Sequence, residues 1–87
     1  RAASPHFSLV WGASREGGAA AVVSKKVARR ATARNLLRRR MLSVMKPFVA
    51  PSHYLVAYAR SGSDSLPFHA LSSELSALLM RATSSHR

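Results

Sequence analysis

The chain has 87 residues, 47% of them apolar, which suits one small domain with a modest core and argues against wholesale disorder. Fourteen Lys and Arg residues stand against three acids, giving a formal net charge of +11, so the expected partner is a polyanion. The absence of cysteine excludes disulfides and thiolate chemistry. No apolar run approaches the roughly 20 residues that cross a bilayer.

Two short strands are predicted near the N-terminus. Alternation over residues 6–11 places Phe7, Leu9 and Trp11 on one face of the first strand. Glycine and serine in the following segment are typical of a turn, and the small and β-branched run at 19–24 predicts a second strand. We therefore expect a hairpin. The small side chains of its second strand either admit a closely approaching partner or fit a thin sheet beneath a helix.

A helix is predicted over residues 32–48, where the apolar period changes to 3.6. Pro47 and Pro51 are expected to end it, because proline removes a backbone donor. The helix should turn one narrow apolar stripe toward the core. That stripe consists of Ala33, Leu37, Met41, Val44 and Phe48.

The same helix and the loop before it carry most of the charge. Nine basic residues fall within 22 positions that contain no acid, which is the pattern of a phosphate-binding surface. A merely solvated face is the alternative, but surface helices usually mix charges of both signs. The basic residues are Lys25, Lys26, Arg29, Arg30, Arg34, Arg38, Arg39, Arg40 and Lys46.

A third strand is predicted at 54–59 and a second helix at 66–82, which opens at Pro67 and has a stripe of leucines at 71, 75, 78 and 79. The basic helix then joins two strands as a β-α-β unit, and the tail at 83–87 should fray. These elements predict a two-layer α/β sandwich with helices on one face of a small sheet and part of the other face uncovered.

The sequence offers no self-contained catalytic centre. The histidines at 6, 53, 69 and 85 show no metal-ligand spacing, and the acids at 16, 64 and 74 form no pair that would hold magnesium. No serine sits in a nucleophile elbow. We expect a binding protein with no catalytic residues and no metal of its own.

The segment VVSKKVARRATARNLLRRR, at 22–40, resembles the signature of the bacterial ribonuclease P protein. That pattern reads roughly S-K-K, a short basic loop, then A-x-x-R-N-x-x-[KR]-R. An aromatic strand, a turn and a leucine-rich helix follow in the family's order, so the resemblance covers about residues 6–82. The matching residues are Ser24, Lys25, Lys26, Ala31, Arg34, Asn35, Arg38 and Arg39.

The resemblance implies an α/β sandwich of the ribosomal-protein-like superfamily, with a rare left-handed β-α-β crossover through the basic helix. It also implies an accessory subunit of an endoribonuclease whose RNA subunit binds Mg²⁺ and carries the catalysis. The implied partners are ribonuclease P RNA and precursor tRNA, in the cytoplasm or an organelle matrix, with no membrane and no small-molecule substrate. The implied RNA-binding residues are Lys25, Lys26, Arg29, Arg30, Arg34, Asn35, Arg38, Arg39, Arg40 and Lys46.

A second surface is expected to hold the single-stranded 5′ leader of precursor tRNA. Small residues that share a face of the first two strands could line its path. A second core beneath a helix is an equal alternative for these positions. They are Ser8, Val10, Ala20, Val22 and Ser24.

Three departures from the family pattern qualify this reading. Leu36 and Leu42 stand where family members usually carry basic residues, and Leu42 falls on the polar side of the helical wheel. The chain also starts at the first strand, without the Phe-rich helix that helps to wall the leader cleft, so we expect one RNA-binding domain over 1–87 lacking that helix. The rival functions are a ribosomal protein or RNA chaperone of the same superfamily, and a basic peptide on anionic membranes, which needs a free apolar face.

Overall fold

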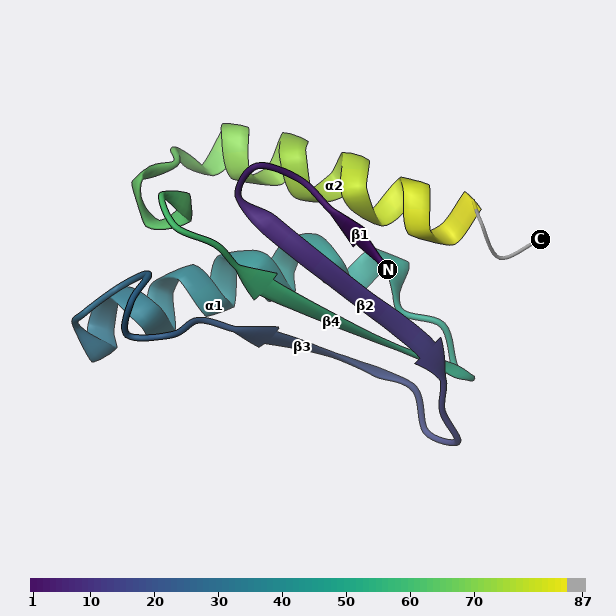
Figure 1. Cartoon of the computed structure of the whole chain (residues 1–87). Helices are drawn as coiled ribbons and strands as arrows, with labels where there is room; N and C mark the ends of the chain where they lie inside the picture. Colours follow the sequence, from purple (N-terminus) through teal and green to yellow (C-terminus); the bar gives the residue numbers. More distant parts are fainter. Residues whose placement is uncertain (85–87) are drawn as a thin grey trace.

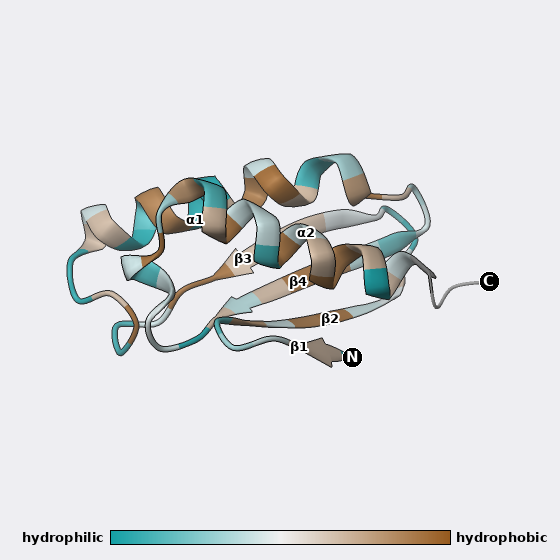
Figure 2. Cartoon of the chain, turned by 90° about the horizontal axis from the view of Figure 1, so that it is seen from above, coloured by the Kyte–Doolittle hydropathy of each residue, from teal (hydrophilic) through white to brown (hydrophobic). Residues whose placement is uncertain are grey.

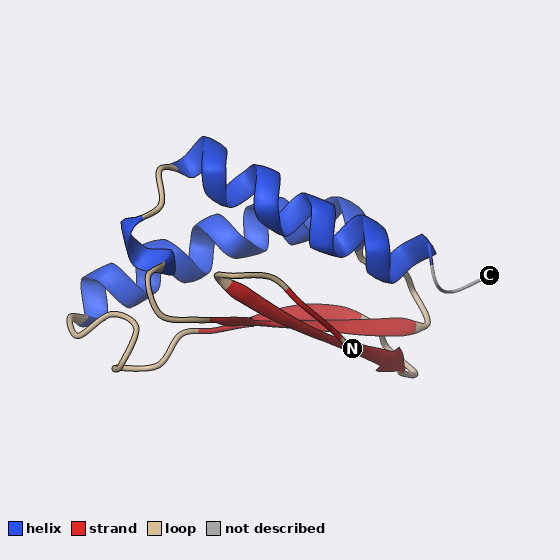
Figure 3. Cartoon of the chain, turned by 45° about the horizontal axis from the view of Figure 1, so that its top comes forward, coloured by secondary structure: helices blue, strands red, loops and turns tan. Residues whose placement is uncertain are grey.

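A mixed four-stranded sheet forms one layer of the structure, and two helices form the other (Figure 3). The computed structural model describes residues 1–84. Two short 3-10 turns, η1 (Lys46–Phe48) and η2 (Ser63–Ser65), follow α1 and β4. The predicted two-layer sandwich is confirmed, with both helices on one face. The strands are β1 (Ala2–Ala3), β2 (Phe7–Ala13), β3 (Gly18–Val22) and β4 (His53–Ala59), and the helices are α1 (Ala31–Met45) and α2 (Phe68–Ser84).

The strand order is β1-β2-β4-β3, so the expected hairpin between β2 and β3 is wrong. β4 lies between them, antiparallel to β2 and parallel to β3. The reason is packing: β4 brings the buried Leu55 and Ala57 to the centre, whereas β3 consists mostly of glycine and alanine and takes the edge. The connection from β2 to β3 therefore passes the chain that enters β4, and the Ser14 N–H donates to the Ser52 carbonyl at 2.9 Å.

The connection from β3 through α1 to β4 is left-handed. In Figure 1 the helices lie behind the sheet, both strands run from right to left, and β4 lies above β3. If the view is rotated so that both strands point upward, β4 lies to the right of β3, and α1 lies behind them. Strand twist makes nearly all such crossovers right-handed, so this arrangement is distinctive. The handedness that the resemblance implied is confirmed.

The core lies between the sheet and the helices. Phe7 and Leu9 on β2 belong to the same buried cluster as Leu71 and Leu75 on α2, and all four are 0% exposed. Each such side chain contributes about 1.5–3 kcal/mol by burial. Hydrophobic residues recur along both helices (Figure 2). The predicted stripes are confirmed: Leu37, Met41, Val44, Leu71, Leu75, Leu78 and Leu79 are buried, and Ala33 and Phe48 pack partly buried against them.

The chain ends differ from the predictions. β1 was not predicted, because two alanines carry no alternation, yet Ala2 pairs opposite Leu9 at the edge of β2. α2 continues to Ser84, and the Thr83 hydroxyl donates to the Leu79 carbonyl at 3.1 Å, so residues 83 and 84 of the expected tail belong to the helix. The remainder of the expected frayed tail, 85–87, lies outside the described residues. None of the described helices is long and apolar enough to cross a membrane.

Candidate nucleic-acid interface

The basic surface begins in the loop between β3 and α1. The N–H groups of Val27 and Ala28 both donate to the Ser24 carbonyl, at 3.1 and 3.2 Å, and form a tight turn. Val23 and Ala28 are buried and fasten the loop to the core at both ends. The basic side chains of the loop are exposed to solvent; they are Lys25, Lys26, Arg29 and Arg30.

Arg34 is the fourth residue of α1, at the end of its first turn, and is half-buried. Its Nη1 donates to the Arg29 carbonyl at 2.7 Å and to the Ala28 carbonyl at 3.1 Å. The helical wheel predicts only that this side chain points away from the core. In the structure, its guanidinium is held by the backbone of the basic loop.

The exposed side of α1 continues the basic surface. Arg38 Nη1 donates to Asn35 Oδ1 at 2.8 Å, which orients both side chains. Together with Thr32 and Arg39 they line a shallow hollow on the helix. Arg39 and Lys46 are exposed, as predicted, and Arg40 is half-buried beside a hollow that also includes Leu36.

The N-terminus of α1 adds to the positive potential of this surface. The helix has no acid in its first turn, and Arg30 at its N-cap makes no side-chain cap hydrogen bond. The partial positive charge of the helix dipole is therefore uncompensated by an acidic or capping side chain. It lies beside the basic loop, so the loop and the helix terminus both favour anions.

One acid lies within this basic region. Asp64, on η2, lines a hollow with the whole turn from Lys25 to Arg30 and with Ala33. It forms no ion pair with the described residues. Sequence reasoning missed Asp64, because only the path of the chain after β4 brings η2 beside the loop before α1.

The position of Leu42 is explained by the edge of the sheet. It is half-buried against the core, and it shares a hollow with Ala19 of β3 and with Lys46. α1 therefore contacts β3 through a second side of the helix. A helical wheel drawn with one apolar stripe does not show this side. Leu42 packs between the helix and the strand, so an apolar residue is suited to this position.

The face of the sheet that carries no helix is the expected leader surface. Both helices cover the other face, so the alternative of a second core beneath a helix is wrong (Figures 1 and 3). Ser8, Val10, Ala20 and Val22 lie on the open face, because they alternate along β2 and β3 with the buried Phe7, Leu9 and Ala21. Ser24 lies beyond the end of β3, in the basic loop, and does not belong to this surface.

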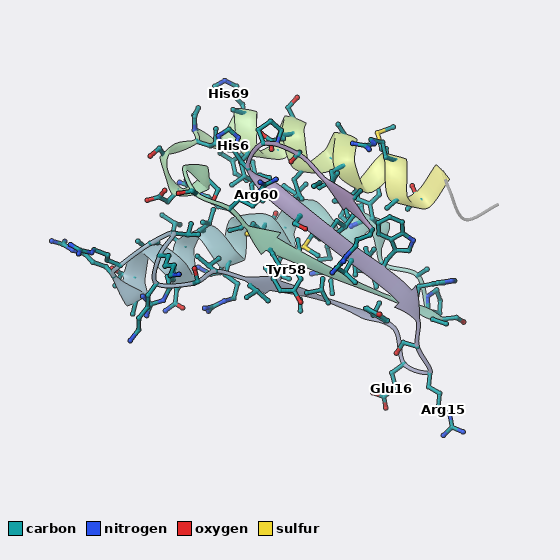
Figure 4. The ribbon with its side chains drawn as sticks, viewed as in Figure 1. His6, Arg15, Glu16, Tyr58, Arg60 and His69 are labelled. Carbon is teal, nitrogen blue, oxygen red and sulfur yellow. The ribbon has the colours of Figure 1, made fainter. Side chains whose placement is uncertain are left out.

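Tyrosines of β4 occupy the middle of this open face. Tyr58 stands between Ser8 and Val22 in the strand register and is 42% exposed (Figure 4). The Tyr54 ring lies over Gly12, where an added Cβ would approach ring atoms to 2.8 Å. Sequence reasoning missed both residues, although the alternation along His53–Ala59 places them opposite the buried Leu55.

A separate polar cluster holds the N-terminal segment. The Glu74 carboxylate on α2 accepts hydrogen bonds from the Ser4 hydroxyl and the His6 N–H, and its Oε1 lies 2.7 Å from His6 Nδ1. Partial burial would raise the pKa of Glu74, but these hydrogen bonds outweigh it and hold the pKa below the usual 4.5. Arg60 Nη1 also donates to the Ser4 carbonyl at 2.9 Å. Within residues 1–84, no three His, Asp or Glu side chains gather to hold a metal ion.

The ribonuclease P family model matches residues 1–83. The chain belongs to the bacterial ribonuclease P protein family. The match begins at residue 1 and so includes β1 and the Ser4–His6 segment as well as the signature. A sequence search of curated proteins finds no match.

Solved structures share the fold of this ribonuclease P protein. The Staphylococcus aureus RNase P protein superimposes with a TM-score of 0.76 at 20% identity, covering 93% of this chain and 78% of that one. A mutant of the S. aureus protein with defective mRNA degradation activity superimposes with a TM-score of 0.80, also at 20% identity, covering 94% and 73%. At this identity the likeness supports the fold, and the family match carries the assignment.

Proposed function

We propose that this ribonuclease P protein binds the catalytic RNA with its basic loop and α1, and the 5′ leader of precursor tRNA on the open sheet face. The observation that carries the proposal is the juxtaposition of an acid-free basic helix with an uncovered sheet. The proposed place of action is the cytoplasm or an organelle matrix, where precursor tRNA is processed.

The basic surface suits a folded RNA. Helical RNA is recognised mainly through phosphates, 2′-hydroxyls and shape, which arginine side chains contact well. Each phosphate contact releases counterions, so affinity should fall steeply with salt. Roughly five to eight contacts would give a log-log slope of about −4 to −7. The candidates are Lys25, Lys26, Arg29, Arg30, Asn35, Arg38, Arg39, Arg40 and Lys46, with Arg34 at their centre.

The open face suits a single strand. Tyr58 offers an exposed aromatic surface for an unstacked base, and the small side chains of β3 leave room beside it. Its neighbours in the register are Ser8 and Val22, with Val10 and Ala20 one step along the strands. The leader path proposed here keeps these four candidates and adds Tyr58.

Catalysis is assigned to the RNA subunit. Mg²⁺ bound there would activate the attacking water and stabilise the charge that develops on the scissile phosphate. The protein's own acids do not fit a magnesium site, because Glu74 is engaged with Ser4 and His6, and Glu16 and Asp64 lie on separate turns. The protein's contribution is to bind both RNAs and reduce the repulsion between them.

Reconstitution tests the proposal. Purified protein alone should leave precursor tRNA intact, and addition of a bacterial ribonuclease P RNA should give Mg²⁺-dependent cleavage at the mature 5′ end. Sequencing of RNA that copurifies with the native chain separates this function from that of a ribosomal protein or RNA chaperone. Specific cleavage by RNA-free protein, or copurification with ribosomal RNA alone, would contradict the proposal.

A further inference from the structure

Arg34 and Arg39 of α1 both belong to the sequence motif, but their surroundings in the structure differ. Arg34 is half-buried, and its Nη1 reaches the carbonyls of Ala28 and Arg29. Arg39 is exposed and forms no hydrogen bond with the described residues. The Nη1 nitrogen of Arg34 carries two N–H groups, and both donate hydrogen bonds to carbonyls of the loop.

We infer that Arg34 is a positioning residue, which fixes the basic loop so that other cations meet the RNA. The inference rests on the proposed function and refines it: the arginine at the centre of the signature acts through the loop. The cations that it positions are Lys25, Lys26, Arg29 and Arg30.

The loop needs these hydrogen bonds to stay ordered, because its own positive charges repel one another. Two pairs of adjacent basic residues lie within one tight turn, and no acid of the described residues forms an ion pair with them. The internal hydrogen bonds of the turn converge on the Ser24 carbonyl, at its start. Arg34 supplies the matching bonds at its end, where the carbonyls of Ala28 and Arg29 precede α1. An ordered loop loses less conformational freedom when RNA binds.

Lysine cannot replace this contact. The guanidinium is a planar fork whose direction is set by the carbonyls, whereas an ammonium is a point charge on a flexible chain. Arg34→Lys therefore keeps the net charge of the surface and removes the fork. Arg39→Lys is the matched control for loop order in the free protein, because it makes the same change on the same helix at a residue that forms no hydrogen bond with the described residues.

The first measurement uses the free protein. Hydrogen exchange of the Val27 and Ala28 amides, both bonded to the Ser24 carbonyl, reports the order of the loop. We expect exchange about tenfold faster in Arg34→Lys and Arg34→Ala, and unchanged in Arg39→Lys. Equal exchange in Arg34→Lys and the parent would overturn the inference whatever the RNA does.

The second measurement is affinity for ribonuclease P RNA. Arg34→Lys should lose affinity by about tenfold, nearly as much as Arg34→Ala. Arg81→Lys makes the same change at an exposed arginine of α2, outside the basic surface, and should bind like the parent. In a Lys25→Ala, Lys26→Ala background the effect of Arg34→Lys should shrink, because the cations that Arg34 positions are gone. Full additivity, or parent-like binding by Arg34→Lys, would show instead that Arg34 is an independent phosphate ligand. If the parent fails to bind this RNA, the proposed function falls, and the exchange data still decide the role of Arg34.

Discussion

The His6 imidazole and the Glu74 carboxylate lie 2.7 Å apart, from Nδ1 to Oε1, and join the start of β2 to α2. The other carboxylate oxygen accepts hydrogen bonds from the His6 N–H, at 2.8 Å, and from the Ser4 hydroxyl. One side chain of α2 thus fixes the turn that connects β1 to β2. The cluster is part of the scaffold that holds the edge of the open face.

Stability should depend on pH through Glu74. Because its folded pKa lies below 4.5, the carboxylate's contribution is present above about pH 4.5 and is lost as the pH falls through the folded pKa. Glu74→Gln should cost about 1–3 kcal/mol at pH 7 and should flatten the loss of stability that follows as the pH falls below about 4.5.

Denaturant unfolding from pH 3 to pH 7 measures this effect. Glu16→Gln is the matched control, because Glu16 is an exposed acid at the tip of the turn between β2 and β3 (Figure 4). It should keep the parent's pH profile. A Glu74→Gln profile as steep as the parent's would show that the hydrogen-bonded cluster does not stabilise the fold.

Leu37→Ala and Arg39→Ala should separate folding from binding. Leu37 is 4% exposed, and its truncation leaves a cavity, so we expect a loss of about 2–5 kcal/mol in the free energy of unfolding. Arg39 is exposed, and its truncation should change stability by no more than about 0.5 kcal/mol. It should weaken RNA binding by about 1–3 kcal/mol through one lost charge-assisted contact. Thermal melts and RNA titrations of both variants test the contrast, which fails if Arg39→Ala binds like the parent.

Tyr58→Ala should weaken binding of the leader and not of the catalytic RNA. Stacking of one base on an aromatic ring contributes about 1–3 kcal/mol. Tyr58→Phe keeps the ring and should bind like the parent. Titration of the reconstituted holoenzyme with precursor tRNA, and with tRNA lacking a leader, measures the difference. An equal loss for both substrates would place the effect of Tyr58 outside the leader path.

The local elements were predictable because each carries a strong periodic signal. The alternation of Phe7 and Leu9 and the helical spacing of Leu37 and Met41 are both found in the structure. Strand order was not predictable in this way. β2 and β3 are joined by a short turn, yet both pair with β4, and no local signal in the sequence places β4 between them.

In the candidate site, too, local features could be predicted from the sequence and tertiary contacts could not. Sequence reasoning predicted the exposed positions of Arg39 and Lys46 from the wheel, and these are confirmed. It did not predict that Arg34 would bond to the loop, because those carbonyls are aligned only by the path of the chain before α1. Leu42 was unexplained for a similar reason: a wheel drawn for one apolar stripe omits contacts with an edge strand.

Asp64 should limit the affinity of the basic surface for any polyanion. Its carboxylate lines the hollow with four cationic side chains and forms no ion pair with the described residues, so it repels an incoming phosphate. Asp64→Asn removes that repulsion with little change in shape. We expect RNA affinity to rise by about twofold to fivefold at low salt and the gain to shrink toward 0.5 M salt, where charges are screened within a few ångströms.

The control for Asp64→Asn is again Glu16→Gln, which raises the net charge by the same unit. Glu16 lies beyond the opposite end of β3, whose five residues alone span roughly 15 Å, more than the Debye length at physiological salt. Its removal should therefore leave affinity nearly unchanged. Titrations of both variants with ribonuclease P RNA and with an unrelated duplex RNA complete the test. A gain in affinity confined to the unrelated RNA would mean that Asp64 selects against wrong partners. Equal gains for both RNAs would mean that Asp64 lowers the affinity for RNA in general. Equal effects of Asp64→Asn and Glu16→Gln would mean that only net charge matters, and the hollow beside η2 would then have no part in RNA binding.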